Sequence, residues 1–381
     1  MRKAGIVLLS FLLAFYTFNS EEIYKKDIRN RLVIQGIGID VEKSGEYLVT
    51  IQAIDTSNQA TASSDSASQP PIKTYEVKGD TIYTAIKSVT EIEGKIPLYS
   101  QNRIIILGKS VTEENMADVI DFFVRDVENS SSVYIAAAEN TAGEILNTKN
   151  GEEYITAESI ETGIGAFEYD AQIFNIQLYD LINRYNSGTK DFAMPLLAVK
   201  EMDNEKSVEI SGTALFNSTK YREKISKEQT LFLNILYNKV NNTALAYAYE
   251  DDKKVSLNIV DSKTERKLTL KNGVPHFKIR VEMQADISEI SGGVATKTEV
   301  NDIEKIASAG EQYIEKETKK LLNSLYSEYN SDSVGLARLI YICEQDFYKK
   351  NEKNLDFVLR NSIYEVEVNL KIRRMGHEFI T

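Results

Sequence analysis

The strictest constraint in this sequence lies in its last third, where apolar and polar residues alternate over long stretches. Residues 277–285 place Phe, Ile, Val, Met and Ala at every second position, and residues 364–372 repeat the pattern with Tyr, Val, Val, Leu and Ile. Such a period of two is typical of strands that bury one face. Asn272-Gly273 supplies a tight turn before the first of these stretches. The last third therefore predicts a sheet.

Two predicted helices separate these alternating stretches. Residues 303–329 carry apolar side chains at helical spacing on one face and Lys and Glu on the other, and residues 334–349 predict a second helix. A strand that follows two helices has to return to the sheet that precedes them. Residues 253–381 therefore predict a C-terminal α+β domain.

The N-terminal part, residues 24–185, predicts a domain that mixes strands and helices. Residues 32–40 and 47–53 predict a hairpin. Asp80 is placed to begin a helix that Gly94 ends. The strand and helix patterns alternate here, which is typical of an α/β or α+β arrangement.

Further elements of this domain follow from caps and short apolar runs. Thr112 is placed as the N-cap of a helix, between apolar strands predicted at 104–107 and 133–138. Residues 171–185 predict another helix, preceded by a flexible joint at Gly163-Ile164-Gly165.

Residues 190–250 predict a middle α+β domain. Strands are expected at 196–202 and 208–216, and Ser226 with Gln229 three residues later is a capping-box pattern that opens a helix. We therefore predict an α+β, multi-domain fold: three mixed α/β domains with antiparallel-rich sheets, behind an N-terminal signal or anchor segment.

The first 20 residues differ from the rest of the chain. Arg2 and Lys3 precede an apolar run over residues 4–18, which is typical of a secretory signal. The run is shorter than the roughly 20 residues that a membrane-spanning helix needs. Since no small-x-small cleavage site follows, the segment is either cut or kept as an N-terminal anchor. Farther along, residues 56–71 are rich in Ser, Ala and Thr and predict a mobile loop.

The overall charge and the scarcity of metal-binding side chains exclude several classes of function. Lys and Arg number 45 against 57 Asp and Glu, a net charge of −12, which argues against a nucleic-acid-binding protein. One Cys and two His leave almost nothing for a His/Cys metal site, although composition leaves a carboxylate-only site open.

Residues that could carry chemistry have simpler structural interpretations. Asp118 and Asp121 share a helix face, but Arg125 falls four residues after Asp121 and predicts a surface ion pair. Cys343 lies at helical spacing from apolar residues, which predicts a buried structural thiol. Gly36-Ile37-Gly38 predicts a glycine-kinked strand in preference to a phosphate loop. We expect no catalytic, cofactor-binding or metal-binding residues.

Several stretches occur in an order that resembles a known family. They are 32–40 (LVIQGIGID), 45–50 (GEYLVT), 79–82 (GDTI), 102–108 (NRIIILG), 121–126 (DFFVRD), 212–216 (GTALF), 332–337 (DSVGLA) and 371–376 (KIRRMG). Together they resemble the Ger(x)C family, the C subunits of spore germinant receptors. The resemblance extends over nearly the whole chain.

The resemblance implies a non-enzymatic subunit of a nutrient receptor. Family members work with a polytopic A subunit and a transporter-like B subunit, at the extracytoplasmic side of the inner spore membrane. They are required for nutrient-triggered germination, and whether this chain contacts the nutrient stays open. The alternatives are a secreted hydrolase or cell-wall enzyme, and an exported adhesin-like module.

Two further expectations come from the family pattern. Family members are lipoproteins with a cysteine after the apolar leader, but the corresponding residues near Ser20 contain none, so no lipidation is expected there. Arg373 and Arg374 form a basic pair at the end of the last predicted strand. They are either a solvated rim or a contact with anionic lipid or an acidic partner surface.

Overall fold

The computed structural model describes most of the chain after residue 30. The described ranges are 31–55, 72–125, 130–149, 155–186, 191–202, 205–250, 253–291, 300–375 and 378–379. The predicted leader at 1–20 and the predicted loop at 56–71 lie outside these ranges. Within them, no helix combines the length and apolar character that crossing a membrane requires.

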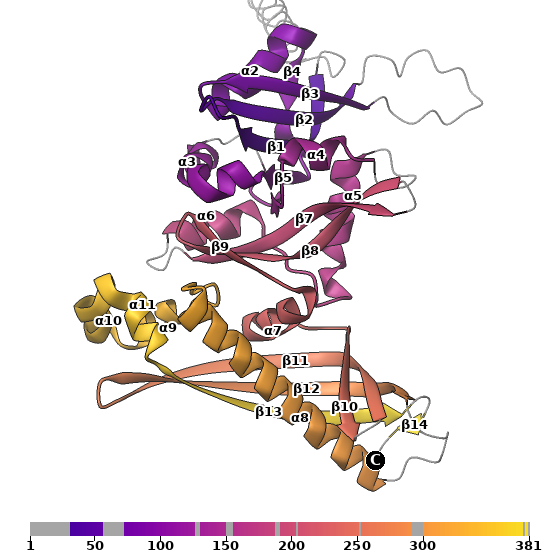
Figure 1. The fold of residues 1–381 in the computed structure, drawn as a ribbon, viewed down its shortest axis with the longest axis vertical. Helices are drawn as coiled ribbons and strands as arrows, with labels where there is room; N and C mark the ends of the chain where they lie inside the picture. Colours follow the sequence, from indigo (N-terminus) through magenta and orange to yellow (C-terminus); the bar gives the residue numbers. More distant parts are fainter. Residues whose placement is uncertain are drawn as a thin grey trace, which may run out of the picture.

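The molecule is elongated, and its described residues form two sheets, one toward each end of the long axis (Figure 1). The first sheet has nine strands in the order β3-β2-β1-β5-β6-β7-β8-β9, with β4 beside β1. Its strands are β1 (Arg31–Val41), β2 (Tyr47–Asp55), β3 (Ile72–Gly79), β4 (Ile96–Leu98), β5 (Ile104–Leu107), β6 (Tyr134–Ala138), β7 (Phe192–Met202), β8 (Glu205–Asn217) and β9 (Lys220–Ile225).

The first sheet is parallel in its middle and antiparallel at both sides. β1, β5, β6 and β7 run parallel to one another, whereas β3-β2-β1 and β7-β8-β9 are antiparallel. The predicted β1–β2 hairpin is confirmed, with Asp40 opposite Leu48. Strands from the predicted N-terminal and middle domains thus share one sheet. The division at 24–185, 190–250 and 253–381 stays a prediction.

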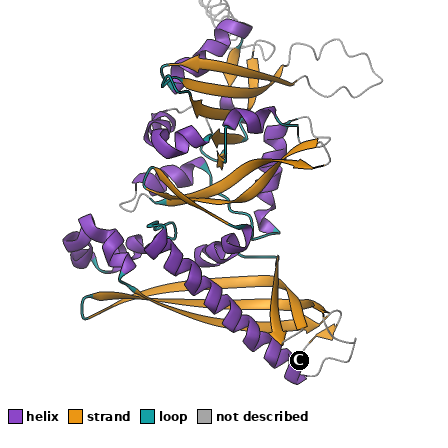
Figure 2. Cartoon of the chain, in the orientation of Figure 1, coloured by secondary structure: helices purple, strands orange, loops and turns teal. Residues whose placement is uncertain are grey.

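Short helices flank the first sheet (Figure 2). They are α2 (Ile82–Glu93), α3 (Met116–Arg125), α4 (Ala142–Asn147), α5 (Thr156–Gly165), the 3₁₀ turn η5 (Ala166–Glu168) and α6 (Leu178–Asn186). A further helix, α7 (Lys227–Tyr237), lies between the two sheets (Figure 1). The predicted capping box of α7 is confirmed, since Ser226 and Gln229 bond reciprocally. Gly94 ends α2 as predicted, with a positive φ of 64°. Thr81, one residue after Asp80, is the N-cap of α2.

The N-cap predicted at Thr112 and the flexible joint predicted at Gly163-Ile164-Gly165 are both wrong. Thr112 lies inside a π-helical turn, η4 (Val111–Asn115), and its hydroxyl donates to the Lys109 carbonyl, so it caps nothing. Gly163 and Gly165 lie within α5, so the predicted joint is helical.

The helix predicted at 171–185 begins only at Leu178. Before it, the backbone is bonded to other elements. The Asn234 amide donates to the Ala171 and Ile173 carbonyls at 2.8 and 2.9 Å, and the Ile135 N–H donates to the Ile176 carbonyl. Tertiary hydrogen bonds therefore replace helical ones over these residues.

The second sheet has the order β10-β11-β12-β13-β14. Its strands are β10 (Thr243–Glu250), β11 (Lys253–Lys271), β12 (Val274–Ser291), β13 (Ile363–Met375) and β14 (Glu378–Phe379). The predicted alternation is confirmed: Phe277, Ile279, Val281 and Met283 are buried, and so are Val366, Leu370 and Ile372. β13 returns parallel to β12, with His276 opposite Ile363.

Helices connect β12 to β13. α8 (Val300–Asn323) crosses the sheet and packs on β13, and a π-helical turn, η6 (Ser324–Glu328), continues it (Figure 1). The second predicted helix is broken at Glu344, whose φ of −138° and ψ of 61° are not helical. It consists of α9 (Leu336–Cys343) and α10 (Gln345–Asn351), which are followed by η7 (Glu352–Asn354) and α11 (Leu355–Arg360). The predicted α+β, multi-domain class is confirmed.

Candidate functional site

The predicted carboxylate pair on α3 does not form a site. The Tyr47 hydroxyl donates to Asp118 at 2.9 Å, whereas Asp121 is exposed and pairs with Arg125 at 2.9 Å. The predicted ion pair is therefore confirmed, and the two carboxylates have different partners. Asp126, a third carboxylate at the end of the stretch 121–126, lies outside the described residues. Among the described residues, no group of three or more His, Cys, Asp or Glu side chains is placed to hold a metal ion.

The burial predicted for Cys343 is wrong, because its side chain is exposed. The prediction placed Cys343 and Phe347, which are four residues apart, on one face of a continuous helix over residues 334–349. Since the helix ends at Cys343, that spacing no longer places the two residues on one face.

The glycines of β1 allow helices to pack closely against the sheet. A Cβ at Gly36 would lie 2.8 Å from the Ala157 Cβ on α5, and one at Gly38 would lie 3.0 Å from the Ala142 Cβ on α4. The strand also bulges between Ile34 and Gly36. The predicted kinked strand is confirmed, and its glycines serve close packing.

Asp40, at the end of β1, ties α4 to the sheet. Its carboxylate accepts the backbone N–H groups of Ala142 and Gly143, both at 3.0 Å. Burial raises the pKa of Asp40, and these two hydrogen bonds oppose the shift. A Cβ at Gly108 would collide with this carboxylate. The stretches 32–40 and 102–108 thus meet at one buried contact.

The candidate site is a second buried carboxylate, Asp332, in the loop between η6 and α9. Its carboxylate accepts the Tyr326 hydroxyl at 2.7 Å and the backbone N–H groups of Gly335, Leu336 and Ala337 at 2.8–3.1 Å. Burial raises the pKa of Asp332, and its hydrogen bonds counteract that rise. The side chain therefore fixes both the loop and the start of α9.

Asp191, just before β7, joins this loop to the first sheet. Its carboxylate accepts the backbone N–H of Asp332 at 2.7 Å and that of Ser218 at 2.8 Å. Burial raises the pKa of Asp191 to about 7, and the charges of Asp332 and Asp356 contribute. A hydrogen bond from Asp332 to Asp191 thus links residues that are 141 positions apart in sequence.

Hydroxyl and amide groups complete the connection. The Ser331 hydroxyl donates to the Phe216 carbonyl at 2.7 Å, and the Ser333 hydroxyl donates to the Phe192 carbonyl at 3.2 Å. The Ser333 carbonyl in turn accepts from the Arg184 guanidinium and the Tyr237 hydroxyl. We call the set Asp191, Ser331, Asp332 and Ser333 the junction.

The junction is a set of structural hydrogen bonds. The Asp332 carboxylate accepts the Tyr326 hydroxyl and three backbone N–H groups, and the Asp191 carboxylate accepts two backbone N–H groups. What it can do is hold the first sheet in a fixed relation to the helices that precede β13. In the sequence, residues 332–337 stand out only through the family resemblance, and no pattern marks Asp191.

Arg373, one of the predicted contact residues, is engaged within the chain. Its guanidinium lies 3.2 Å from the Asp286 carboxylate on β12, and the two side chains are 29% and 22% exposed. Arg374 is half-buried beside it. Their contact with a partner or with lipid stays a prediction.

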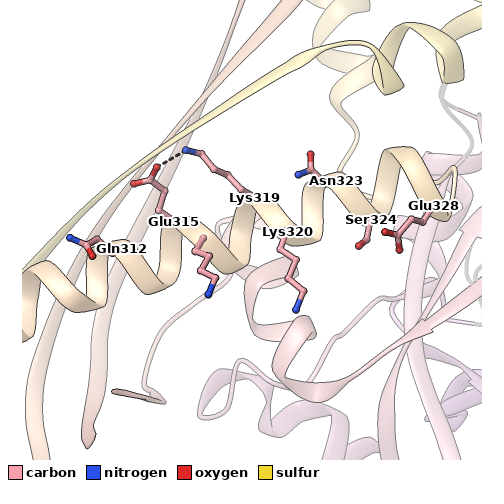
Figure 3. A pocket seen from close by; sticks show the side chains of 8 residues that line it. Gln312, Glu315, Lys319, Lys320, Asn323, Ser324 and Glu328 are labelled. Carbon is pink, nitrogen blue, oxygen red and sulfur yellow. Dashed lines mark hydrogen bonds and ion pairs between the residues drawn. The ribbon is translucent and has the colours of Figure 1, made fainter. Parts of the chain in front are cut away.

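The hollow drawn in Figure 3 has only one wall. Its volume is about 600 Å³, and the eight side chains that line it, including Lys316, Lys319 and Lys320, all come from α8 and η6. Figure 3 shows Lys319 bridging to Glu315 along the same helix. A small ligand here would stay largely in water, unlike one in an enclosing pocket.

Comparisons with known proteins agree with the layout of the motifs. The family described as "Spore germination protein N-terminal domain" matches residues 24–199, and "Spore germination B3/ GerAC like, C-terminal" matches residues 211–376. The chain belongs to the Ger(x)C family. Its family stretches at 32–40, 102–108 and 332–337 are those that build the buried contacts at Asp40 and at the junction.

Two spore germination proteins resemble this chain along its length. It is 22% identical to spore germination protein B3 of Bacillus subtilis (strain 168), covering 92% of this chain and 93% of that protein. It is 20% identical to spore germination protein KC of the same organism, covering 92% and 91%. The crystal structure of the GerBC protein matches with a TM-score of 0.58 and 18% identity, covering 88% of this chain and 96% of that one. The match shows a shared fold.

Proposed function

We propose that this chain is the C subunit of a nutrient germinant receptor. It assembles with a polytopic A subunit and a transporter-like B subunit at the inner spore membrane, on the extracytoplasmic side. It contributes contacts and no chemistry to nutrient-triggered germination. A ligand-driven change in the receptor would act through contacts that differ between its states.

The observation that carries the proposal is the match of both family halves, in order, over residues 24–376. The buried contacts support a non-enzymatic role, because the stretches that carry the resemblance are used for packing. Glycines bring α4 and α5 onto β1, and Asp332 binds backbone donors.

The direct test is deletion of the coding sequence followed by germination assays with single nutrients. We expect loss of the response to at least one nutrient, and recovery when the wild-type sequence is restored. Normal germination with every nutrient would overturn the proposal. Turnover of a cell-wall substrate by the purified protein would favour the hydrolase alternative.

Assembly is tested separately, by solubilising spore membranes and purifying the chain through a C-terminal tag. We expect one polytopic and one transporter-like protein to copurify. Recovery of the chain alone from germination-competent spores would contradict assembly with A and B subunits.

Attachment to the membrane has to be explained without a cysteine near Ser20, because a thioether-linked lipid needs a thiol. We propose that the apolar N-terminus and the partner subunits jointly keep the chain at the membrane, because a single weak anchor gives only marginal membrane binding. Replacing residues 1–20 with an efficiently cleaved secretory signal tests the first of these. Partial release from the membrane fraction is expected, and unchanged retention would assign attachment to the partners alone.

A further inference from the structure

Three strands with an open edge carry exposed charged side chains. These strands are β3 and β9 at the two sides of the first sheet, and β13, which β14 covers only at Arg374 and Met375. Charged residues at an edge hinder the addition of a further strand. The exposed charged residues are Lys73, Glu76 and Lys78 on β3, Lys220, Arg222, Glu223 and Lys224 on β9, and Glu365 and Lys371 on β13.

β10, at one edge of the second sheet, differs from these strands. No residue from Thr243 to Tyr249 is charged, and the outward side chains are those of Ala244, Ala246 and Ala248, all exposed. β11 is its only partner among the described strands. The other edge of β10 therefore offers backbone N–H and C=O groups to a further strand, with no charged side chain in the way.

An exposed aromatic ring lies beside the start of β10. Tyr169 is 73% exposed, more than any other large apolar side chain among the described residues. Two residues later, the Ala171 N–H donates to the Thr243 hydroxyl at 3.1 Å, so the ring lies close to the open edge. Aromatic side chains are enriched in protein interfaces, and an exposed one next to an unpaired edge indicates a surface that an assembly covers.

The two ends of this edge carry different charges. Glu168 and Asp170 supply carboxylates at the end where β10 begins. Where β10 ends, Lys253 and Lys305 supply ammonium groups, and their side chains are 39% and 59% exposed. The acidic partners of these two lysines are Glu250 and Asp302. An antiparallel copy of the same edge would place each carboxylate end beside an ammonium end, and a two-fold axis would make that contact twice.

We infer that β10 pairs with β10 of a second copy of this chain, antiparallel across a two-fold axis. Ala246 would face Ala246 of the other copy, and Ala244 would face Ala248, so that methyl groups meet on the outer side. The buried side chains of Leu245 and Tyr247 would continue the apolar layer of the sheet across the axis. The proposed function involves no second copy of this chain, so a failure of the pairing would leave that function untouched.

The central pair of alanines provides a charge test. Ala246→Lys places two ammonium groups directly opposite each other at the axis, and Ala246→Glu places two carboxylates there. Each variant alone should associate at least tenfold more weakly than the wild type. An equimolar mixture of the two variants should dimerise again, because a lysine then faces a glutamate. Gln284→Lys, at an exposed position on the central strand β12, is the matched control and should associate within twofold of the wild type.

The measurement is sedimentation velocity of the full chain over a concentration series. We expect a reversible dimer for the wild type, and circular dichroism verifies that every variant is folded. A monomeric wild type, association of Ala246→Lys equal to that of the wild type, or a mixture of variants that stays monomeric would each overturn the pairing.

The register is tested by disulfide trapping in a Cys343→Ser background, because Cys343 is itself exposed. Ala246→Cys should give a covalent dimer under mild oxidation, since two residues directly opposite each other are close enough to be bridged. Ala244→Cys should stay monomeric on a denaturing gel, because its counterpart in the other copy lies about 13 Å away along the strand. Equal trapping at both positions, or none at position 246, would refute the register.

Discussion

The two sheets are stabilised in different ways. In the second sheet, β11 and β12 pair over 17 matched positions, and β13 pairs with β12 over 12 more. Backbone hydrogen bonds along these long strands therefore do much to hold the second sheet together. In the first sheet, the central strands β5 and β6 have only four and five residues. There, side chains such as Asp40 bind the backbone of neighbouring helices. A single side chain should therefore matter more in the first sheet and at the junction than in the second sheet.

The largest effect is expected from Asp332→Ala at the junction. The substitution leaves three backbone N–H groups and the Tyr326 hydroxyl without their acceptor, in a fully buried place. The free energy of unfolding should fall by about 4 kcal/mol, measured by urea denaturation. Asp346→Ala, at an exposed position in α10, is the control and should change little. Equal effects of the two substitutions would mean that the buried Asp332 carboxylate stabilises the fold no more than an exposed carboxylate does.

Gly108→Ala tests the contact at Asp40 in the first sheet. The added methyl group would collide with the Asp40 carboxylate and move it away from α4. We expect a loss of about 3 kcal/mol in the free energy of unfolding. Gly165→Ala, whose Cβ would face open space, should be neutral or slightly stabilising. A neutral Gly108→Ala variant would show that the close contact can relax.

Asp191→Asn tests the role of charge at the junction. The folded chain raises the pKa of Asp191 from 3.8 to about 7, so folding favours its protonated form. The resulting stability is fully present below pH 4 and is lost as the pH rises through 7. Between pH 5 and 8 the free energy of unfolding of the wild type should fall by about 2 kcal/mol more than that of the variant. Parallel stability curves for the two proteins would refute this origin of the pH dependence.

The smallest effect is expected from Glu367→Gln on the outer face of the second sheet. Glu367 pairs with Lys278 and Arg280, but all three are exposed to solvent. Solvated ion pairs of this kind contribute little to stability. The urea midpoint should not change measurably. A clear decrease would mean that the second sheet also depends on single side chains.

The same contrast explains which structural features the sequence could predict. The alternation at Phe277–Ala285 reports burial directly, and the capping box at Ser226 is local, so both predictions hold. The non-helical backbone before Leu178 is fixed by Asn234, some 60 residues away, and no local pattern records that bond. The exposure of Cys343 follows from a helix break at Glu344 that no glycine or proline marks.

The junction was recognisable in part. Residues 332–337 stand out through the family resemblance, but a lone Asp191 before a strand resembles any loop residue. Its role depends on the fold bringing β7 next to the loop after η6.

The exposure of Cys343 has a practical consequence. It is the sole thiol in the chain, and it lies at the surface at the end of α9. A maleimide dye or a photoactivatable crosslinker would therefore attach at one known place in the unmutated protein. Any polypeptide that docks near α9 could be captured and identified with the natural sequence intact.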